Sequence, residues 1–331
     1  MPLSPNWTRG KIGKVLRQAI FVGGAVLSLT PWSSPLFAIG LGALLSLLLT
    51  NPNPRLGQTL SEFFLQLSVI LLGFDMSFTL VAKAMISNTL PAAVTVFGGI
   101  LIGLFLGKVL GIRMREATLV AAGTAICGGS AIVAMGSATK ADDEDITVAI
   151  GTVFLLNAAA LYLFPIIGHA LHLAEPQFGD WAGLAIHDVS SVVAAGEAYG
   201  RNALQLAVAS KLMRVIWILP AVWILSRVLD RYSPIPSHSF NTSSERREKR
   251  HFPWFIGLFL GACLARQYVP LMVTVGPVLS RCGETALVLT FFLMGTDVSR
   301  KTLRALTWRP VTQAILLWAM ISTATLLFAR R

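Results

Sequence analysis

Charged residues are scarce in this chain. Only 13% of its 331 residues are charged and 54% are hydrophobic, whereas soluble domains carry about 25% charged residues. This composition excludes an ordinary soluble domain and predicts an integral membrane protein. The apolar residues form near-continuous runs rather than short alternating segments, which excludes a membrane β-barrel and favours α-helices, whose backbone groups bond internally.

Cysteine is also rare, and enzyme motifs are missing. The three cysteines, Cys127, Cys263 and Cys282, lie in apolar runs without the spacing of a disulfide framework or a metal centre. The chain has no HExxH or P-loop motif, and no GxSxG motif with partners for a catalytic triad. We therefore expect no enzyme activity, no catalytic residue, no metal and no cofactor.

Negative charge is in short supply, so the net charge is +11. Most basic residues fall between apolar runs, where they act as topology signals or contact anionic lipid headgroups. We therefore expect the lipid bilayer as a partner and no nucleic acid. The polar stretch 227–251 is expected to be a cytoplasmic linker.

The apolar runs predict an all-α polytopic membrane protein with about 10–11 transmembrane helices. Basic loops fall on one side when the N-terminus is placed in the cytoplasm, and this topology puts the acidic loop Asp142–Asp145 on the opposite side. The first run, Ala19–Leu29, is either a short membrane helix or a cleaved signal, and we favour the helix because another apolar run follows at once. The runs begin near Gln18, Pro35, Leu60, Pro91, Ala117, Ile146, Gly179, Ala203, Phe252, Gly276 and Pro310.

Two stretches of the chain are near copies of each other. Residues 122–136 read AGTAICGGSAIVAMG and residues 182–196 read AGLAIHDVSSVVAAG. They differ most at the centre, where Cys127-Gly128-Gly129 is replaced by His187-Asp188-Val189. The glycines can interrupt a helix and free amide groups for an anion, or they can allow close helix packing together with Gly123 and Gly136.

A second pair of similar strings ends at matched aspartates. Leu72–Ser77 resembles Met294–Ser299, so Asp75 and Asp297 occupy equivalent positions. The expected topology orients these segments oppositely, which is typical of inverted repeats in secondary transporters. Two full spans at 122–136 and 182–196 would instead run the same way, so that pair is either a tandem copy or includes a segment that does not cross.

Several ionisable residues fall inside apolar runs, where a charge costs about 2.5 to 3.5 kcal/mol. His187 can exchange a proton near neutral pH, and Asp188 favours a cation or a basic partner. Lys211 and Arg214, one helical turn apart, are the candidate partners. The alternatives are a functional site and a purely structural ion pair.

The strings AGTAICGGSAIVA, KADDEDITVAIGTV, WAGLAIHDVSSVVAAGEAYG and ALQLAVASKLMRV closely resemble the YeiH family of bacterial inner-membrane proteins, also known as a sulfate exporter family. The resemblance runs over nearly the whole chain and includes LLGFDMS at residues 71–77. Family members commonly read IHE where this chain has Ile186-His187-Asp188, which keeps the negative charge on a shorter side chain.

More distantly, CGGSAIV followed by Asp145, Thr152-Val153 and Pro165 is similar to the broken-helix region of bile-acid-sodium-symporter-like carriers. This similarity implies inverted repeats, discontinuous core helices and an elevator-like motion. It divides the chain into an N-terminal basic segment with a first short helix (1–34), a first helical repeat (35–175) and a second repeat (176–331).

Together these features predict a secondary active transporter of the bacterial inner membrane that exports a small anion such as sulfite, sulfate or a small organic anion. The alternative is an anion channel, or a structural membrane protein without transport coupling. A homodimer is left open. Coupling to protons or Na⁺ is assigned to His187, Asp188, Asp75 and Asp297. The expected substrate-binding residues are Cys127, Gly128, Gly129, Ser130, Ser190, Ser191, Lys211 and Arg214.

Overall fold

The computed structural model describes residues 11–30, 35–49, 51–139, 141–232, 254–297 and 306–330. Within these ranges every regular element is a helix, which confirms the all-α prediction. The helices are α1 (Lys11–Ser28), α2 (Pro35–Leu49), α3 (Pro54–Gly73), α4 (Phe78–Ser87), α5 (Thr89–Val109), α6 (Met114–Ala125), α7 (Gly129–Thr139), α8 (Asp143–Ala170), α9 (Glu175–Ala185), α10 (Val189–Tyr199), α11 (Arg201–Ile216), α12 (Ile218–Tyr232), α13 (Trp254–Tyr268), α14 (Leu271–Thr296) and α16 (Trp308–Ala329).

Six helical segments of the described chain are long and apolar enough to cross a membrane. α1 and α2 are shorter apolar helices, and α1 packs on both α2 and α14. The first apolar run is helical, and whether it is a membrane helix or a cleaved signal stays a prediction. The six segments are Leu56–Gly73, Thr89–Val109, Asp143–Ala170, Arg201–Leu225, Leu271–Thr296 and Trp308–Ala329.

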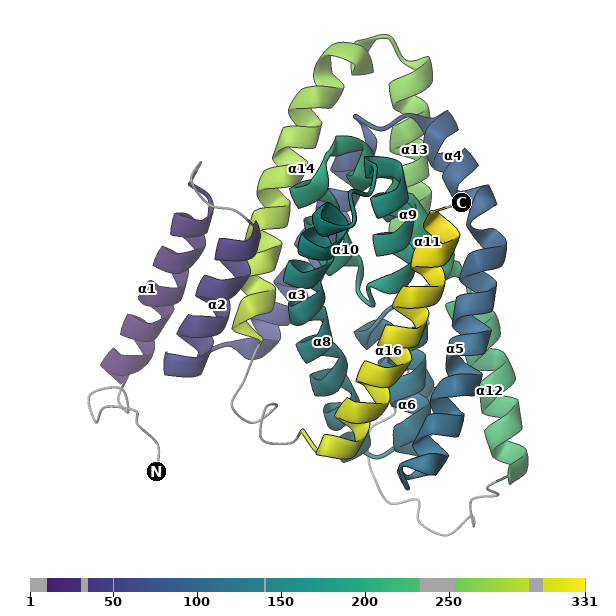
Figure 1. The fold of residues 1–331 in the computed structure, drawn as a ribbon. Helices are drawn as coiled ribbons and strands as arrows, with labels where there is room; N and C mark the ends of the chain where they lie inside the picture. Colours follow the sequence, from purple (N-terminus) through teal and green to yellow (C-terminus); the bar gives the residue numbers. More distant parts are fainter. Residues whose placement is uncertain are drawn as a thin grey trace.

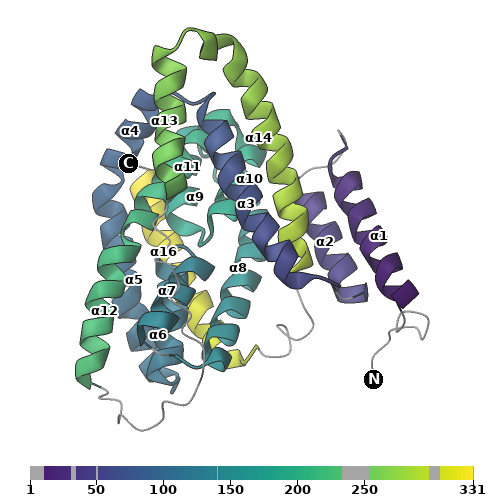
Figure 2. The ribbon, with the colours of Figure 1, turned by 180° about the vertical axis from the view of Figure 1, so that it is seen from behind.

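The helices pack mainly in two groups (Figures 1 and 2). The flanking bundle consists of α1, α2, α3, α13 and α14, in which α14 packs on α2 and α3. The core bundle consists of α4 to α12 and α16. α4 contacts α13 where the bundles meet. Each bundle draws helices from both predicted repeats.

α3 and α14 run in opposite directions along each other. At one end, a Cβ added to Gly276 would collide with the carbonyl oxygen of Phe74. Midway along the pair, a Cβ on Gly283 would lie 3.1 Å from the carbonyl oxygen of Ser68. Gly57, at the start of α3, lies beside Thr296 at the end of α14. The inverted orientation predicted for the two aspartate strings is confirmed.

α6 and α7 form a helical hairpin instead of one crossing segment. A Cβ on Gly123 of α6 would lie 2.7 Å from Ile132 of α7, and one on Gly136 of α7 would lie 3.8 Å from Leu119 of α6. Residues equally distant from the turn thus face each other, which only an antiparallel pair allows. Gly123 and Gly136 therefore allow α6 and α7 to pack closely, which was one of the two alternatives for these glycines.

α9 and α10 fold back on each other in the same way. The rings of Phe178 on α9 and Tyr199 on α10 stack with their centroids 3.7 Å apart, and the Tyr199 hydroxyl donates to the carbonyl of Leu173. Gly183 lets α9 approach α11, since a Cβ there would lie 2.6 Å from the carbonyl oxygen of Ala207. This second hairpin is therefore held closely against α11.

The two hairpins enter the core bundle from opposite ends. α6 follows α5 at the lower end of Figure 1, and α9 follows α8 at the upper end. A full crossing at 122–136 and at 182–196 is therefore wrong for both strings. Because each string turns back on itself, the two copies are inverted, and their orientation no longer conflicts with that of Asp75 and Asp297.

The acidic residues at the start of α8 lie at the same end as the basic residues before α6. Arg113 forms ion pairs with Asp145 and, at 3.7 Å, with Glu116. Placing Asp142–Asp145 on the opposite side was wrong, because that topology counted the hairpin as a crossing. α12 continues to Tyr232, so the first part of the expected linker is helical; 233–251 lies outside the described residues.

Candidate functional site

The first hairpin turns at Ile126, Cys127 and Gly128. Gly128 has φ +74°, a left-handed conformation that residues with a Cβ rarely adopt, and its amide donates to the carbonyl of Gly123 at 2.9 Å. Gly129 then begins α7 and has no heavy atom within 4 Å of an added Cβ. Gly129 and Ser130 are exposed, whereas the residues before them are buried. Cys127 Sγ lies 2.8 Å from Ser130 Oγ.

The second hairpin turns at Ile186, His187 and Asp188. Asp188 caps α10, since its Oδ2 accepts from the amide of Ser190 at 3.1 Å and from the Ser190 hydroxyl. A carboxylate at this position also interacts favourably with the positive end of the α10 dipole. Ser190 and Ser191, in the first turn of α10, are buried. The turn ends where Asp188 caps α10.

The turns of the two hairpins meet inside the core bundle. A Cβ on Gly128 would lie 3.7 Å from the Cβ of Asp188 and 3.7 Å from Nδ2 of Asn157 on α8. The substituted centres of the paired strings therefore face each other. We call this meeting point the tip site and define it by residues 126–130, 186–191 and Asn157.

Lys211 and Arg214 of α11 bind the carbonyl ends of the two half-helices that lead into the tips. Lys211 Nζ donates to Ile126 at 3.2 Å and to Ile186 at 2.5 Å. Arg214 donates to Ala125 at 2.8 Å, to Thr124 at 3.0 Å and to Leu184. Both side chains are fully buried. These cations satisfy carbonyls that would otherwise lack partners and oppose the negative ends of α6 and α9.

His187 and Asp188 do not pair with these cations. The ion pairs among the described residues join Arg113 to Glu116 and Asp145, and Arg201 to Asp75. The expected ion pair between His187 or Asp188 and α11 is thus absent from the described part of the chain. The reason is that the turn carbonyls of both hairpins occupy the ammonium and guanidinium donors.

The His187 imidazole points into an aromatic environment. It is fully buried, its ring lies 5.6 Å from that of Trp318, and neither ring nitrogen has a hydrogen-bond partner among the described residues. Buried polar atoms without partners are uncommon in folded proteins. Three more such oxygens lie on helices beside the tips, on Thr124, Thr152 and Asn157. The tip site therefore holds unused hydrogen-bonding capacity.

Asp75 and Asp297 lie away from the tips, at opposite ends of the α3–α14 pair. Asp297 directly follows α14, next to the hydrogen bond from Asn51 to Thr296 at 3.1 Å. Burial, and secondarily the nearby Glu62, raises the pKa of Asp297 to about 7. Any coupling role of these two aspartates would therefore be exercised outside the tip site.

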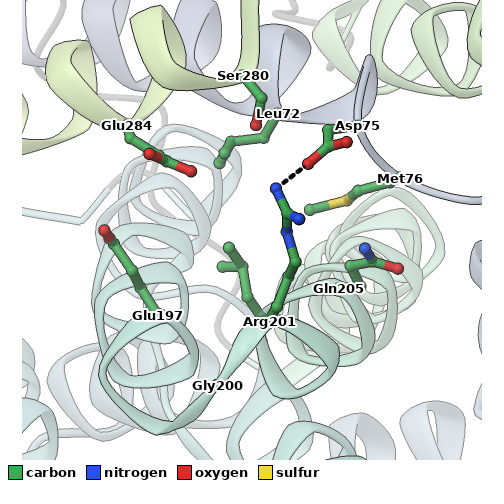
Figure 3. Close-up of a pocket in the computed structure, with 10 residues that line it drawn as sticks. Leu72, Asp75, Met76, Glu197, Gly200, Arg201, Gln205, Ser280 and Glu284 are labelled. Atoms are coloured by element: carbon green, nitrogen blue, oxygen red, sulfur yellow. Dashed lines mark hydrogen bonds and ion pairs between the residues drawn. The ribbon is translucent and has the colours of Figure 1, made fainter. Parts of the chain in front are cut away.

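Asp75 lines a cleft between the two bundles (Figure 3). The cleft has a volume of about 280 Å³, and Arg201 of the core bundle reaches across it to form an ion pair with Asp75. Glu197 from the core bundle and Glu284 from the flanking bundle also line it. A charged contact thus bridges the bundles at this end of the molecule.

Asp180 of α9 is a carboxylate inside the core bundle that the sequence motifs did not single out. Its Oδ1 accepts from Asn88 Nδ2 at 2.7 Å and from Ser210 Oγ at 2.8 Å. The apolar run was expected to start near Gly179, and no role was predicted for Asp180 at its beginning. In the sequence, Asp180 is visible only as an acidic residue just before Trp181. That position does not reveal that Asn88 and Ser210 bind it.

Comparison with known proteins gives a consistent result over most of the chain. The family model described as "Conserved hypothetical protein 698" matches residues 15–314. A "UPF0324 membrane protein" of Bacteroides thetaiotaomicron is 38% identical over 299 residues, covering 90% of this chain and 86% of the relative. One from Geobacter sulfurreducens is 38% identical, covering 95% of this chain and 96% of the relative. No solved structure matches.

Proposed function

Because the chain belongs to the family described as "Conserved hypothetical protein 698", whose matched members are named UPF0324 membrane proteins, we propose that this multi-pass membrane protein is a secondary active transporter of a small anion. This is the same family as the YeiH family, so the resemblance seen in the sequence motifs is confirmed.

The observation that carries the proposal is the meeting of two inverted hairpins at Gly128 and Asp188. Hairpins that enter from opposite ends bring non-helical backbone to mid-depth, where such backbone is tolerated only if it is buried or lines a cavity. Secondary transporters place substrate between discontinuous helices of inverted repeats in the same manner.

The charges at the tip site favour an anion. Lys211 and Arg214 bring two positive charges, against one carboxylate from Asp188, whose Oδ2 already accepts from the amide and the hydroxyl of Ser190. The α7 N-terminus, at Gly129 and Ser130, faces open space and offers free amide groups and a hydroxyl. An anion bound here would contact the N-terminus of α7 and be attracted electrostatically by the Lys211 ammonium.

In this proposal the core bundle moves against the flanking bundle and carries the tip site from one membrane face to the other. The substrate is sulfite, sulfate or a small organic anion, and export from the cytoplasm is the proposed direction. His187 and Asp188 couple the movement to protons or Na⁺. The chain resides in the bacterial inner membrane with its N-terminus in the cytoplasm.

The test is counterflow of labelled sulfite or sulfate in proteoliposomes, followed by uptake under imposed ion gradients. A carrier gives saturable counterflow, and His187→Ala or Asp188→Asn weakens its response to the ion gradient. Asp143→Asn, at an exposed position of α8, serves as the control. Flux that neither saturates nor exchanges would make the protein a channel, and no flux of any small anion would overturn the proposal.

A further inference from the structure

The side chains of Asn88 and Ser210 donate hydrogen bonds to Asp180, away from the hairpin turns. Asn88, at the junction of α4 and α5, donates to Asp180 and, at 2.9 Å, to Ser210 Oγ on α11. Ser210 Oγ in turn donates to Asp180. Asn88 is only 1% exposed and Ser210 is fully buried. Three separate elements of the core bundle thus converge on one carboxylate.

Neutral groups alone bind this carboxylate. The ion pairs of the described chain all lie elsewhere, and Lys211 and Arg214 direct their donors to the hairpin carbonyls. α9 packs on α5, α10, α11 and α16, and Asn88 adjoins α4. None of the cationic residues on these helices forms an ion pair with Asp180 within the described ranges: Lys83, Lys108, Arg201, Lys211, Arg214 and Arg309. The acidic residue on these helices, Glu197, lines the cleft between the bundles.

A carboxylate inside a helix bundle with no cationic partner is costly when ionised, and taking up a proton removes this cost. Asn88 can serve both states. Its Oδ1 is buried and has no hydrogen-bond partner in the described structure. If the amide turns over, this oxygen can accept from the hydroxyl of protonated Asp180, whereas Nδ2 donates to the ionised form as observed. Asp180 is only partly buried, so a proton can reach it.

We propose that Asp180 is the proton-binding residue of the carrier. This inference rests on the proposed transport function and deepens it: the coupling proton binds at the Asn88–Asp180–Ser210 cluster, and His187 and Asp188 pass the resulting change on to the substrate at the tip site. A proton from water on one side binds the carboxylate in one state of the carrier and leaves to water on the other side in the other state. A single carboxylate binds a single proton, so one proton moves per cycle.

The cluster is connected to the tip site through α11. Ser210 precedes Lys211, whose ammonium holds the turn carbonyls of both hairpins. Gly183 of α9 packs directly on Ser210, since a Cβ there would lie 2.7 Å from the Ser210 Cβ. Protonation removes the negative charge of the carboxylate to which Ser210 and Asn88 donate. It thereby changes how α9 packs on α11.

The first test compares wild type with Asp180→Asn, which preserves size and hydrogen bonding but cannot exchange a proton. Wild type in proteoliposomes should accumulate the labelled anion when a pH gradient of one orientation is imposed, up to about tenfold per pH unit for one coupled proton. The variant should show no accumulation with either orientation yet retain counterflow. Asp143→Asn, at an exposed site, should behave as wild type.

The second test does not depend on transport. Infrared difference spectra of the protein in lipid nanodiscs, recorded from about pH 5 to about pH 9, should show a carboxylic-acid band that wild type has and Asp180→Asn lacks. If the spectra of the two proteins coincide, or if the variant still accumulates anion under a pH gradient, the assignment of Asp180 is overturned. Absence of counterflow in wild type, with the band present, would instead overturn the transport proposal alone.

Discussion

At the scale of single residues, Lys211 and Arg214 show that a buried charge need not find an opposite charge. The half-helices α6 and α9 end inside the bundle, where their last carbonyls cannot reach water. One ammonium and one guanidinium satisfy five of these oxygens. The spacing of Lys211 and Arg214 in the sequence placed both cations in the right region. It could not reveal that their donors bind backbone carbonyls, because the pattern of side chains contains no information about those carbonyls.

Replacing Lys211 by methionine should destabilise the protein. The loss of two hydrogen bonds from a charged donor predicts a decrease in unfolding free energy of about 1.5 to 3 kcal/mol. Thermal unfolding of the purified protein in detergent measures the effect. Lys108→Met, at an exposed position of α5, is the matched control, and equal melting temperatures for the two variants would show that the carbonyl contacts contribute little.

The neighbouring glycines Gly128 and Gly129 should respond differently to alanine. Gly128 has φ +74°, so an L-residue costs about 1 to 2 kcal/mol there. Gly129 begins a helix with free space around its Cα, so alanine should be neutral or stabilise by about 0.5 to 1 kcal/mol. Melting temperatures of the two single variants test this, and greater damage at Gly129 would contradict the turn geometry.

At the scale of helices, the sequence located both breaks but could not tell a kinked crossing from a hairpin. The centres Cys127-Gly128-Gly129 and His187-Asp188 lie at the turns, as the substitution pattern indicated. Whether the chain continues or returns depends on contacts such as Gly123 with Ile132 and Phe178 with Tyr199. These contacts join residues on either side of the turn, and helical periodicity contains no information about them.

The hairpin geometry predicts a labelling pattern. In a Cys282→Ser background, which removes the exposed native thiol, cysteines at Met114 and Asp143 flank the first hairpin, and cysteines at Ala174 and Asn202 flank the second. A membrane-impermeant maleimide should label the first pair from one face of the membrane and the second pair from the other. Labelling of the two members of either pair from opposite faces would mean that the segment crosses.

At the scale of the whole molecule, the two bundles divide the fold by packing rather than by chain order. The flanking bundle takes α2 and α3 from the first predicted repeat, α13 and α14 from the second, and α1 from the N-terminal segment. Repeats related by inversion can build such shared bundles, and the sequence supported the inversion through Asp75 and Asp297. It could not predict the bundle boundary, which follows from contacts between distant helices such as α3 and α14.

Movement of one bundle against the other predicts that a link between them stops transport. Cysteines at Asp75 and Arg201, whose native side chains bridge the cleft, can be joined by a short cleavable bismaleimide (Figure 3). Counterflow should fall to the level of empty liposomes and recover when the linker is cleaved. The same reagent across Asp75 and Ser280, both in the flanking bundle, should leave counterflow unchanged; full counterflow with the first pair linked would exclude this motion.

In the proposed mechanism, a small anion binds where the two hairpin turns meet. The most direct measurement is the rate at which a charged thiol reagent modifies Ser130→Cys in the Cys282→Ser background, with sulfate or another transported anion added at increasing concentration. We expect the rate to fall and saturate with anion concentration, whereas the rate at Met114→Cys, at the hairpin entrance, is unaffected. An unchanged rate at Ser130→Cys, at concentrations that saturate counterflow, would contradict it.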